Sequence, residues 1–138
     1  MKIVFSEDLA VRYPANPVEN PDRVLGPARL LEECGYSFVR PLPAEVEDIA
    51  RVHGREHLEN VRRAGMYDAA ALAAGSAICA AELAVAGEPA FALARPPGHH
   101  ASANRAWGMC YFNSIAIAVK KIRPKAKRAL IIDIDLHF

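Results

Sequence analysis

The chain of 138 residues contains few cysteines, few aromatic residues and little excess charge. Its three cysteines, Cys34, Cys79 and Cys110, are widely spaced, which predicts no disulfide framework. Buried reduced thiols in a cytoplasmic protein are expected instead. A formal net charge of +1 argues against nucleic acid or an anionic membrane as an electrostatic partner.

A long hydrophobic run is also missing. The longest apolar stretch, Ala69 to Ala81, is rich in alanine and interrupted by Gly75 and Ser76, so no membrane span is expected. Only a short apolar run separates Lys2 from Ser6, which does not fit a signal peptide. With 52% hydrophobic and 24% charged residues, the composition is typical of a soluble globular protein.

The length fits a single domain over residues 1–138, built from short apolar runs that alternate with helical patterns. We expect strands at 2–5, 36–39, 89–94 and 128–134. Pro27 is expected to begin a helix that Gly35 ends, and Gly87 to end a later helix. The predicted helices cover 27–33, 44–51, 55–63, 68–86 and 113–122. This alternation predicts an α/β fold with three αβα layers and a mostly parallel sheet.

The strand predicted at 128–134 leads into Asp133, Asp135 and His137. Side chains alternate along a strand, so these three are expected on one face if the extended run continues through them. Carboxylates are costly to bury unless they are paired or bound to a metal. The pattern therefore predicts a site for zinc or another divalent transition metal, which would activate water for hydrolysis.

Two adjacent histidines, His99 and His100, follow the strand predicted at 89–94 and a Pro-Pro-Gly turn. They can place two imidazoles at distinct positions around one cavity and move protons at neutral pH. His53 and His57 are spaced four apart, but Gly54 between them weakens a helix. We expect His53 to be an ordinary turn residue and His57 a solvated helix residue.

Four motifs carry a family resemblance. Residues 3–8 (IVFSED), 95–101 (RPPGHHA), 108–113 (GMCYFN) and 133–138 (DIDLHF) occur in this order. The chain resembles the superfamily of histone deacetylases and acetylpolyamine amidohydrolases, and in particular the N-terminal half of the arginase/deacetylase fold. An arginase-like ureohydrolase is a weaker alternative, because the run from RPPGHHA to GMCYFN is unlike those enzymes.

The resemblance implies roles for particular residues. Asp135 and His137 would be metal ligands, and His99 and His100 the general base and acid. Asp133 would pair with His99 and could help to hold a structural monovalent cation. Met109 would line the channel for an acetyl-lysine or acetylpolyamine substrate, where relatives commonly have an aromatic residue.

The resemblance also implies that the family's third metal ligand, an Asp, and the Tyr that polarises the substrate carbonyl lie beyond these residues. The chain is therefore expected to be truncated relative to the family and weak or inactive alone. We expect a homo-oligomer, or a complex with a separately encoded C-terminal half. The alternative is a non-catalytic assembly or binding module with a vestigial metal site.

Overall fold

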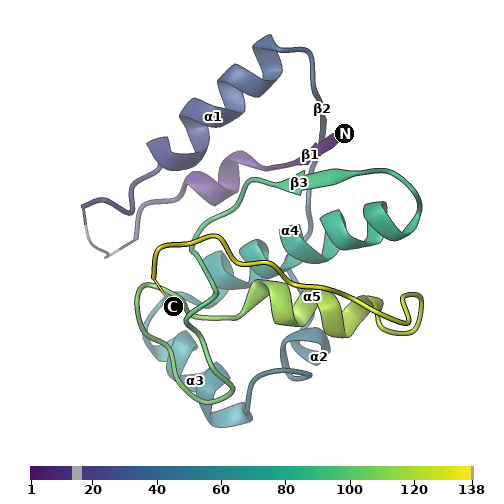
Figure 1. The fold of residues 1–138 in the computed structure, drawn as a ribbon. Coiled ribbons are helices and arrows are strands. Elements are labelled where there is room, and N and C mark those ends of the chain that lie inside the picture. The colour runs from purple at the N-terminus through teal and green to yellow at the C-terminus, as the bar shows by residue number, and fades with distance from the viewer. Residues whose placement is uncertain (14–16, 138) are drawn as a thin grey trace.

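The computed structural model describes residues 1–13 and 17–137. Within these residues three short strands, β1 (Lys2–Val4), β2 (Ser37–Val39) and β3 (Ala90–Ala92), form one sheet in the order β2-β1-β3 (Figure 1). Both pairings are parallel. Ile3 in the central strand lies opposite Phe38 on one side and Phe91 on the other. The predicted α/β class with a parallel sheet is confirmed.

Helices cover both faces of this sheet (Figure 1). On one face, Val24 and Ala28 of α1 pack against Ile3 and Leu93. On the other face α4 contacts the sheet, and α5 packs against the far side of α4. The helical elements are η1 (Glu7–Ala10, a 3-10 turn), α1 (Asp22–Glu33), α2 (Val46–Ile49), α3 (Arg55–Arg63), α4 (Tyr67–Val85) and α5 (Ser114–Ile122).

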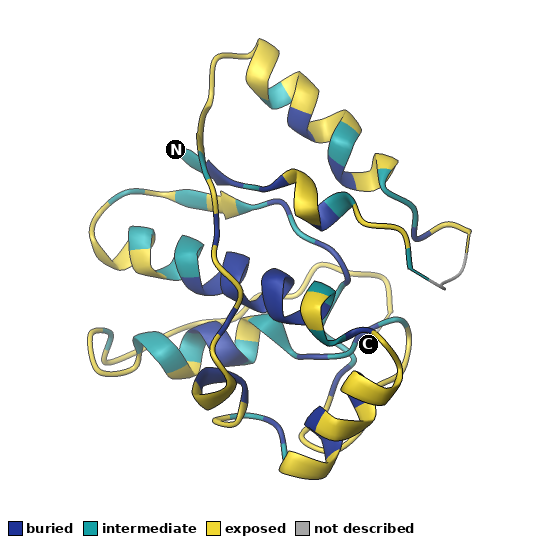
Figure 2. Cartoon of the chain, turned by 180° about the vertical axis from the view of Figure 1, so that it is seen from behind, coloured by how far each residue is buried: buried dark blue, intermediate teal, exposed yellow. Residues whose placement is uncertain are grey.

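The middle of α4 is the most enclosed part of the protein (Figure 2). Residues 70–78 are all buried, and Gly75 packs so closely on the 42–44 backbone that a Cβ there would lie 1.9 Å from the Leu42 carbonyl oxygen. By length and composition α4 could cross a membrane, with a mean hydropathy of 1.5 over 18 residues. Its burial between the sheet and α5 accounts for that composition, because such a helix must be small and apolar on every side.

Local signals placed most helix ends correctly. Helix α3 has the predicted bounds, α4 is shifted by one residue at both ends, and α5 begins one residue later than predicted. Gly35 and Gly87 follow α1 and α4 with φ of 77° and 92°, the left-handed conformation that glycine adopts without steric cost. Asn113 caps α5 by accepting a hydrogen bond from the Ala116 amide at 3.0 Å.

Two helix predictions were wrong in extent. Helix α1 begins at Asp22, and Pro27 lies inside it, because the Asn20 side chain accepts a hydrogen bond from the Asp22 amide and starts the helix earlier. The helix predicted at 44–51 is reduced to one turn, Val46–Ile49. The Ala44 amide donates to the Ala71 carbonyl at 2.8 Å, so this end is bound to α4.

The strand predicted at 128–134 is absent. These residues are in no strand, and Leu130, Ile132 and Ile134 are 85%, 75% and 94% exposed. An apolar, β-branched run becomes a strand only where a ladder of backbone hydrogen bonds is available to it. The expectation of buried thiols also holds only for Cys110, because Cys34 is exposed and Cys79 partly exposed.

Candidate functional site

The loop after β3 is anchored by Arg95, which is 3% exposed. Its Nε donates to the buried Glu19 carboxylate at 2.8 Å, and its two terminal nitrogens donate to the carbonyls of Leu9, Val11 and Glu19. Tyr13 donates to the same carboxylate at 2.7 Å, and burial first and Glu19 second raise the pKa of this phenol. The loop is therefore fixed to the segment that follows η1.

The tandem histidines lie side by side and have different further partners. Their ring centroids are 4.0 Å apart. His99 Nδ1 lies 3.0 Å from Asp133 Oδ2, and its Nε2 lies 4.0 Å from Asp135 Oδ1. The His100 ring contacts the Trp107 ring at 4.5 Å, tilted by 40°, and lies 6.3 Å from the ring of His137. Both predicted clusters of residues are thus brought to one place.

The segment from Asp133 to His137 reaches this place without being a strand, so the condition for the predicted alternation of faces is not met. The side chains of Asp133 and Asp135 instead each accept a hydrogen bond from the backbone amide two residues ahead. The Asp135 amide donates to Asp133 Oδ1 at 2.9 Å, and the His137 amide donates to Asp135 Oδ1 at 2.7 Å. The motif's last residue, Phe138, lies outside the described residues.

These bonds also set the charge state of the two carboxyls. The Asp135 amide first and His99 second lower the pKa of Asp133. The His137 amide, and then its side chain, lower the pKa of Asp135. Both groups are therefore carboxylates at neutral pH, the form that accepts a proton donor or binds a cation.

The Asp135–His137 pair fits two positions of a metal site. Asp135 Oδ1 lies 3.1 Å from His137 Nδ1. Two ligands at the usual zinc distances of about 2.0–2.1 Å in a tetrahedron would be roughly 3.3 Å apart. A third ligand is not in place: over residues 1–13 and 17–137, no group of three or more His, Cys, Asp or Glu side chains could hold a metal ion.

A tight turn, residues 107–110, packs against His100. The Cys110 amide donates to the Trp107 carbonyl at 2.9 Å, and Gly108 and Met109 have φ of 58° and 64°. A Cβ on Gly108 would lie 2.5 Å from the His100 ring, so only glycine fits there. Met109, predicted to line the substrate channel, is half-buried in this turn.

Sequence reasoning missed three aromatic groups near this loop. His53 and His57, expected at a turn and in solvent, are 3% and 2% exposed and hydrogen bonded to backbone at 102, 111 and 113. Trp107 is 55% exposed and in contact with His100. The single Trp of the sequence, which stands between RPPGHHA and GMCYFN, was the available signal for Trp107.

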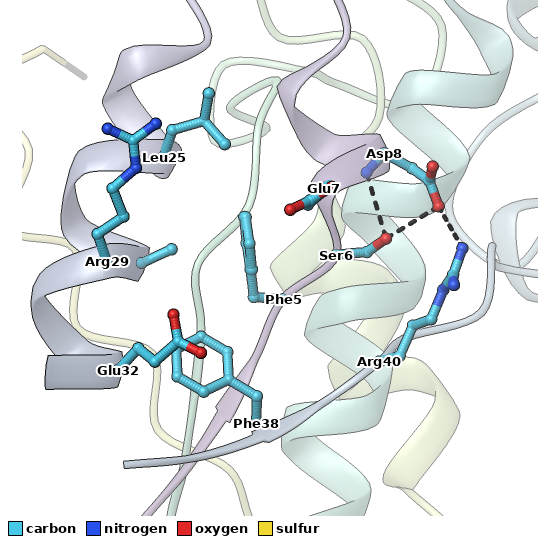
Figure 3. Close-up of a pocket in the computed structure, with 10 residues that line it drawn as sticks. Phe5, Ser6, Glu7, Asp8, Leu25, Arg29, Glu32, Phe38 and Arg40 are labelled. Carbon is cyan, nitrogen blue, oxygen red and sulfur yellow. Dashed lines mark hydrogen bonds and ion pairs between the residues drawn. The ribbon is translucent and has the colours of Figure 1, made fainter. Parts of the chain in front are cut away.

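Two hollows border these elements. A groove of about 610 Å³ runs beside the site, lined by residues 97–99, 113–116 and 131–135. A second, of about 620 Å³, lies between α1 and the segments that follow β1 and β2 (Figure 3). It contains none of the predicted site residues, and its carboxylate Asp8 is bonded to Ser6 and Arg40.

The parallel sheet covered by helices defines an α/β protein. Beside the sheet the paired imidazoles of His99 and His100 meet the segment from Asp133 to His137, which forms a candidate hydrolytic centre. The histone deacetylase domain family model matches residues 63–138, and the chain belongs to the histone deacetylase family. The predicted resemblance is thereby confirmed. The relatives of the chain are named deacetylases and amidohydrolases.

The relatives agree with this assignment. A probable deacetylase of Methanothermobacter thermautotrophicus is 35% identical over 99% of this chain and 47% of its own length. A histone deacetylase-like amidohydrolase of Pseudomonas aeruginosa is 36% identical over 69% of this chain and 30% of its own. Human histone deacetylase 9 is 33% identical over 99% of this chain and 13% of its own length.

Among solved structures, the HD domain of HDA15 superposes with a TM-score of 0.79 at 25% identity, covering 89% of this chain and 43% of that one. The fold prediction is again supported by this match. The chain spans less than half the length of each of these relatives.

Proposed function

We propose that this chain carries the proton-transfer histidines and two metal ligands of a zinc-dependent deacetylase acting on acetyl-lysine or an acetylpolyamine. The observation that carries the proposal is the contact of His99 with Asp133, with the His100 ring centroid 4.0 Å from that of His99 and Asp135 Oδ1 4.0 Å from His99 Nε2. Asp135 and His137 would hold the metal. When bound, it would polarise the amide carbonyl and lower the pKa of a water molecule.

The His99 imidazole has the geometry of a general base. A proton on Nδ1 is donated to the Asp133 carboxylate at 3.0 Å, which leaves the lone pair on Nε2. Nε2 is turned toward Asp135, so it can take a proton from a water molecule held beside that carboxylate. The carboxylate also stabilises the imidazolium that results.

His100 would supply the second proton. As water oxygen bonds to the acetyl carbon, the C–N bond breaks and the amine nitrogen needs a proton, which the protonated His100 would give. Products are acetate and a free amine. Trp107 and the Gly108 backbone hold the His100 ring in position for this step.

Further polypeptide is required in this proposal. The described residues supply two ligands, whereas catalytic zinc sites have three from protein. The exposed apolar residues of the same segment form a surface that other polypeptide would cover. They are Leu130, Ile131, Ile132, Ile134 and Leu136. A second copy, or a separately encoded partner, would meet both needs, and light scattering that shows a monodisperse monomer would count against this part.

The deciding experiment is hydrolysis of an acetyl-lysine peptide and of N-acetylputrescine, with added zinc, by the chain in the assembly that supplies the third ligand. Activity that chelation, His99→Ala and His100→Ala each abolish would support the proposal. Arg105→Ala, an exposed change in the same loop, should retain the rate. A rate indifferent to both histidine substitutions would overturn it.

A second function, a non-catalytic assembly or binding module, is favoured by the incomplete ligand set and the exposed apolar segment. It predicts no hydrolysis of either substrate, together with stable association through residues 130–136. Replacing Ile132 and Ile134 with Lys would then abolish association, while Leu42→Lys, at another exposed apolar position, would not.

A further inference from the structure

His53 and His57 form a stacked imidazole pair that the proposed chemistry does not use. Their rings are 4.9 Å apart at 27°, and the Phe112 ring contacts both, at 5.3 and 6.0 Å. His53 ends the turn after α2, and His57 lies on α3. Histidines enclosed to this degree require partners for their ring nitrogens.

The partners of His53 define its tautomer. The Asn113 amide donates to His53 Nε2 at 2.9 Å, so this nitrogen must carry the lone pair. The proton then sits on Nδ1, which donates to the Ser102 carbonyl at 2.9 Å. His53 is therefore a neutral imidazole bonded to backbone groups eleven positions apart.

His57 supports the same loop from α3. Its Nε2 lies 2.7 Å from the Tyr111 carbonyl, which can only accept, so Nε2 carries a proton. The Gly54 amide adds a bond to the Ala103 carbonyl at 2.9 Å. Four backbone groups of the loop are thus bound to the short segment 53–57.

These contacts bear on the tandem histidines because the loop is compact. The backbone of Gly98, the residue before His99, packs on the Phe112 carbonyl and the Ser114 amide, where a Cβ would lie at 2.5 and 2.9 Å. Displacing Asn113 would therefore move the support beneath Gly98. It would also disturb the cap of α5.

We propose that His53 is a positioning residue for residues 98–113, the histidine loop: its neutral imidazole joins the Ser102 carbonyl to the Asn113 amide and so fixes the backbone that carries His99 and His100. His57 reinforces it. We call the bonds from His53 to the Ser102 carbonyl and the Asn113 amide the clamp. The link of the clamp to catalysis rests on the proposed deacetylase function, whereas the clamp itself does not.

The clamp is sensitive to protonation. A proton on His53 Nε2 would face the Asn113 N–H, setting two donors against each other. Burial first, and the charge of His57 second, lower the pKa of His53 below 6.5. Other ionisable groups packed nearby are the phenols of Tyr67 and Tyr111, while Asp48 on α2 is paired with Arg51 and Lys121.

The sign of the pH effect follows. A histidine whose pKa is lowered on folding contributes its full stability above its unfolded value and loses it as pH falls through the folded value. The clamp is therefore complete at pH 7 and above, and loosens below pH 6.5.

NMR of the ¹⁵N-labelled chain tests the clamp without any enzymatic assay. At pH 7 the His53 nitrogens should show a protonated Nδ1 and an unprotonated Nε2. In His53→Ala, exchange of the Asn113 amide with solvent should quicken by roughly tenfold, as for one lost hydrogen bond, and the His99 and His100 signals should shift.

Two variants separate positioning from general destabilisation. In His53→Gln the side-chain oxygen can accept from the Asn113 amide near the place of Nε2, so its slow exchange should be restored. Leu58→Ala, a buried change on α3, should speed exchange of Asn113 and of the core amide of Ile117 together. Should His53→Ala fail to fold, the glutamine variant and the tautomer of His53 in the wild type still decide whether His53 holds the Asn113 amide.

The proposal is overturned by the opposite tautomer, by Asn113 exchange in His53→Ala that rises no more than that of Ile117, or by failure of glutamine to restore it. None of these readouts depends on deacetylation, so they stand apart from a negative result in the hydrolysis assay.

Discussion

The Nδ1 atom of His99 lies 3.0 Å from a carboxylate oxygen of Asp133, 34 positions along the chain. Asp133 belongs to a segment that has no strand neighbours, and this contact joins it to the histidine loop. The same carboxylate accepts from the Asp135 amide through its other oxygen. One side chain thereby orients a candidate base and the turn that presents a candidate metal ligand.

Replacing Asp133 should therefore release the turn. In Asp133→Ala we expect faster hydrogen exchange at the Asp135 amide and a shift of the His99 signals, with Tm unchanged because the site is exposed. Asp133→Asn is the matched control, since its oxygen can still accept from Asp135. Equal exchange in the alanine variant and the wild type would contradict the role given to this contact.

Metal binding should depend on Asp135 and His137. Titration with Co²⁺, followed by its visible absorption, should show affinity reduced by more than about tenfold in Asp135→Ala and in His137→Ala, since even the loss of a ligand's hydrogen-bond partner costs that much. Asp68→Ala, an exposed carboxylate on α4, should bind as the wild type does. Unchanged affinity in both site variants would rule out this pair as ligands.

Two glycine substitutions in helices should differ in their effect on stability. Gly75→Ala would set a Cβ against the Leu42 carbonyl and the Ala44 amide, and backbone cannot yield cheaply, so a loss of about 2 kcal/mol or more in unfolding free energy is expected. Gly26→Ala in α1 meets nothing within 4 Å beyond its chain neighbours, but Pro27 follows it and disfavours a side chain in the helical conformation, which offsets the usual gain of alanine over glycine, so a change of less than about 1 kcal/mol is expected. Urea denaturation measures both, and a neutral Gly75→Ala would show that α4 is less closely packed.

Breaking the Arg95–Glu19 ion pair should cost far more unfolding free energy than breaking the Arg23–Glu19 ion pair. Both side chains are buried, at 3% and 2% exposure, so Glu19→Gln leaves an uncompensated guanidinium and should cost about 3 kcal/mol of stability. Arg23, which contacts the same carboxylate at 3.5 Å, is 58% exposed, and Arg23→Ala should cost less than about 1 kcal/mol. Similar losses in the two variants, measured in urea, would refute the distinction.

Asp8 offers a pH test at the second hollow (Figure 3). The Ser6 hydroxyl first and Arg40 second lower the pKa of Asp8 below 3.8. Ser6→Ala and Arg40→Met should each raise this pKa, as followed by carboxyl ¹³C shifts. Since the pKa is lowered on folding, any stability from Asp8 is complete above pH 3.8 and is lost as pH falls through the folded value. A pKa of Asp8 that Ser6→Ala leaves unchanged would contradict the hydrogen-bond account.

Much of the architecture was readable from local pattern. The bounds of α3, the glycines after α1 and α4, and the cap at Asn113 depend on residues within a few positions of one another, so sequence alone could place them. The family was readable for the same reason: RPPGHHA, GMCYFN and DIDLHF are contiguous.

Tertiary contacts decided the features that residues close in the sequence do not encode. The burial of His53 and His57 depends on carbonyls and amides about fifty positions away, which no spacing rule supplies. Residues 128–134 had the composition of a strand but no ladder to join, and α1 began earlier than Pro27 suggested. The sequence by itself determined which residue types would carry the chemistry, since motifs are local. Only the tertiary structure decided that His99 meets Asp133, because that contact requires the chain to bring distant segments together.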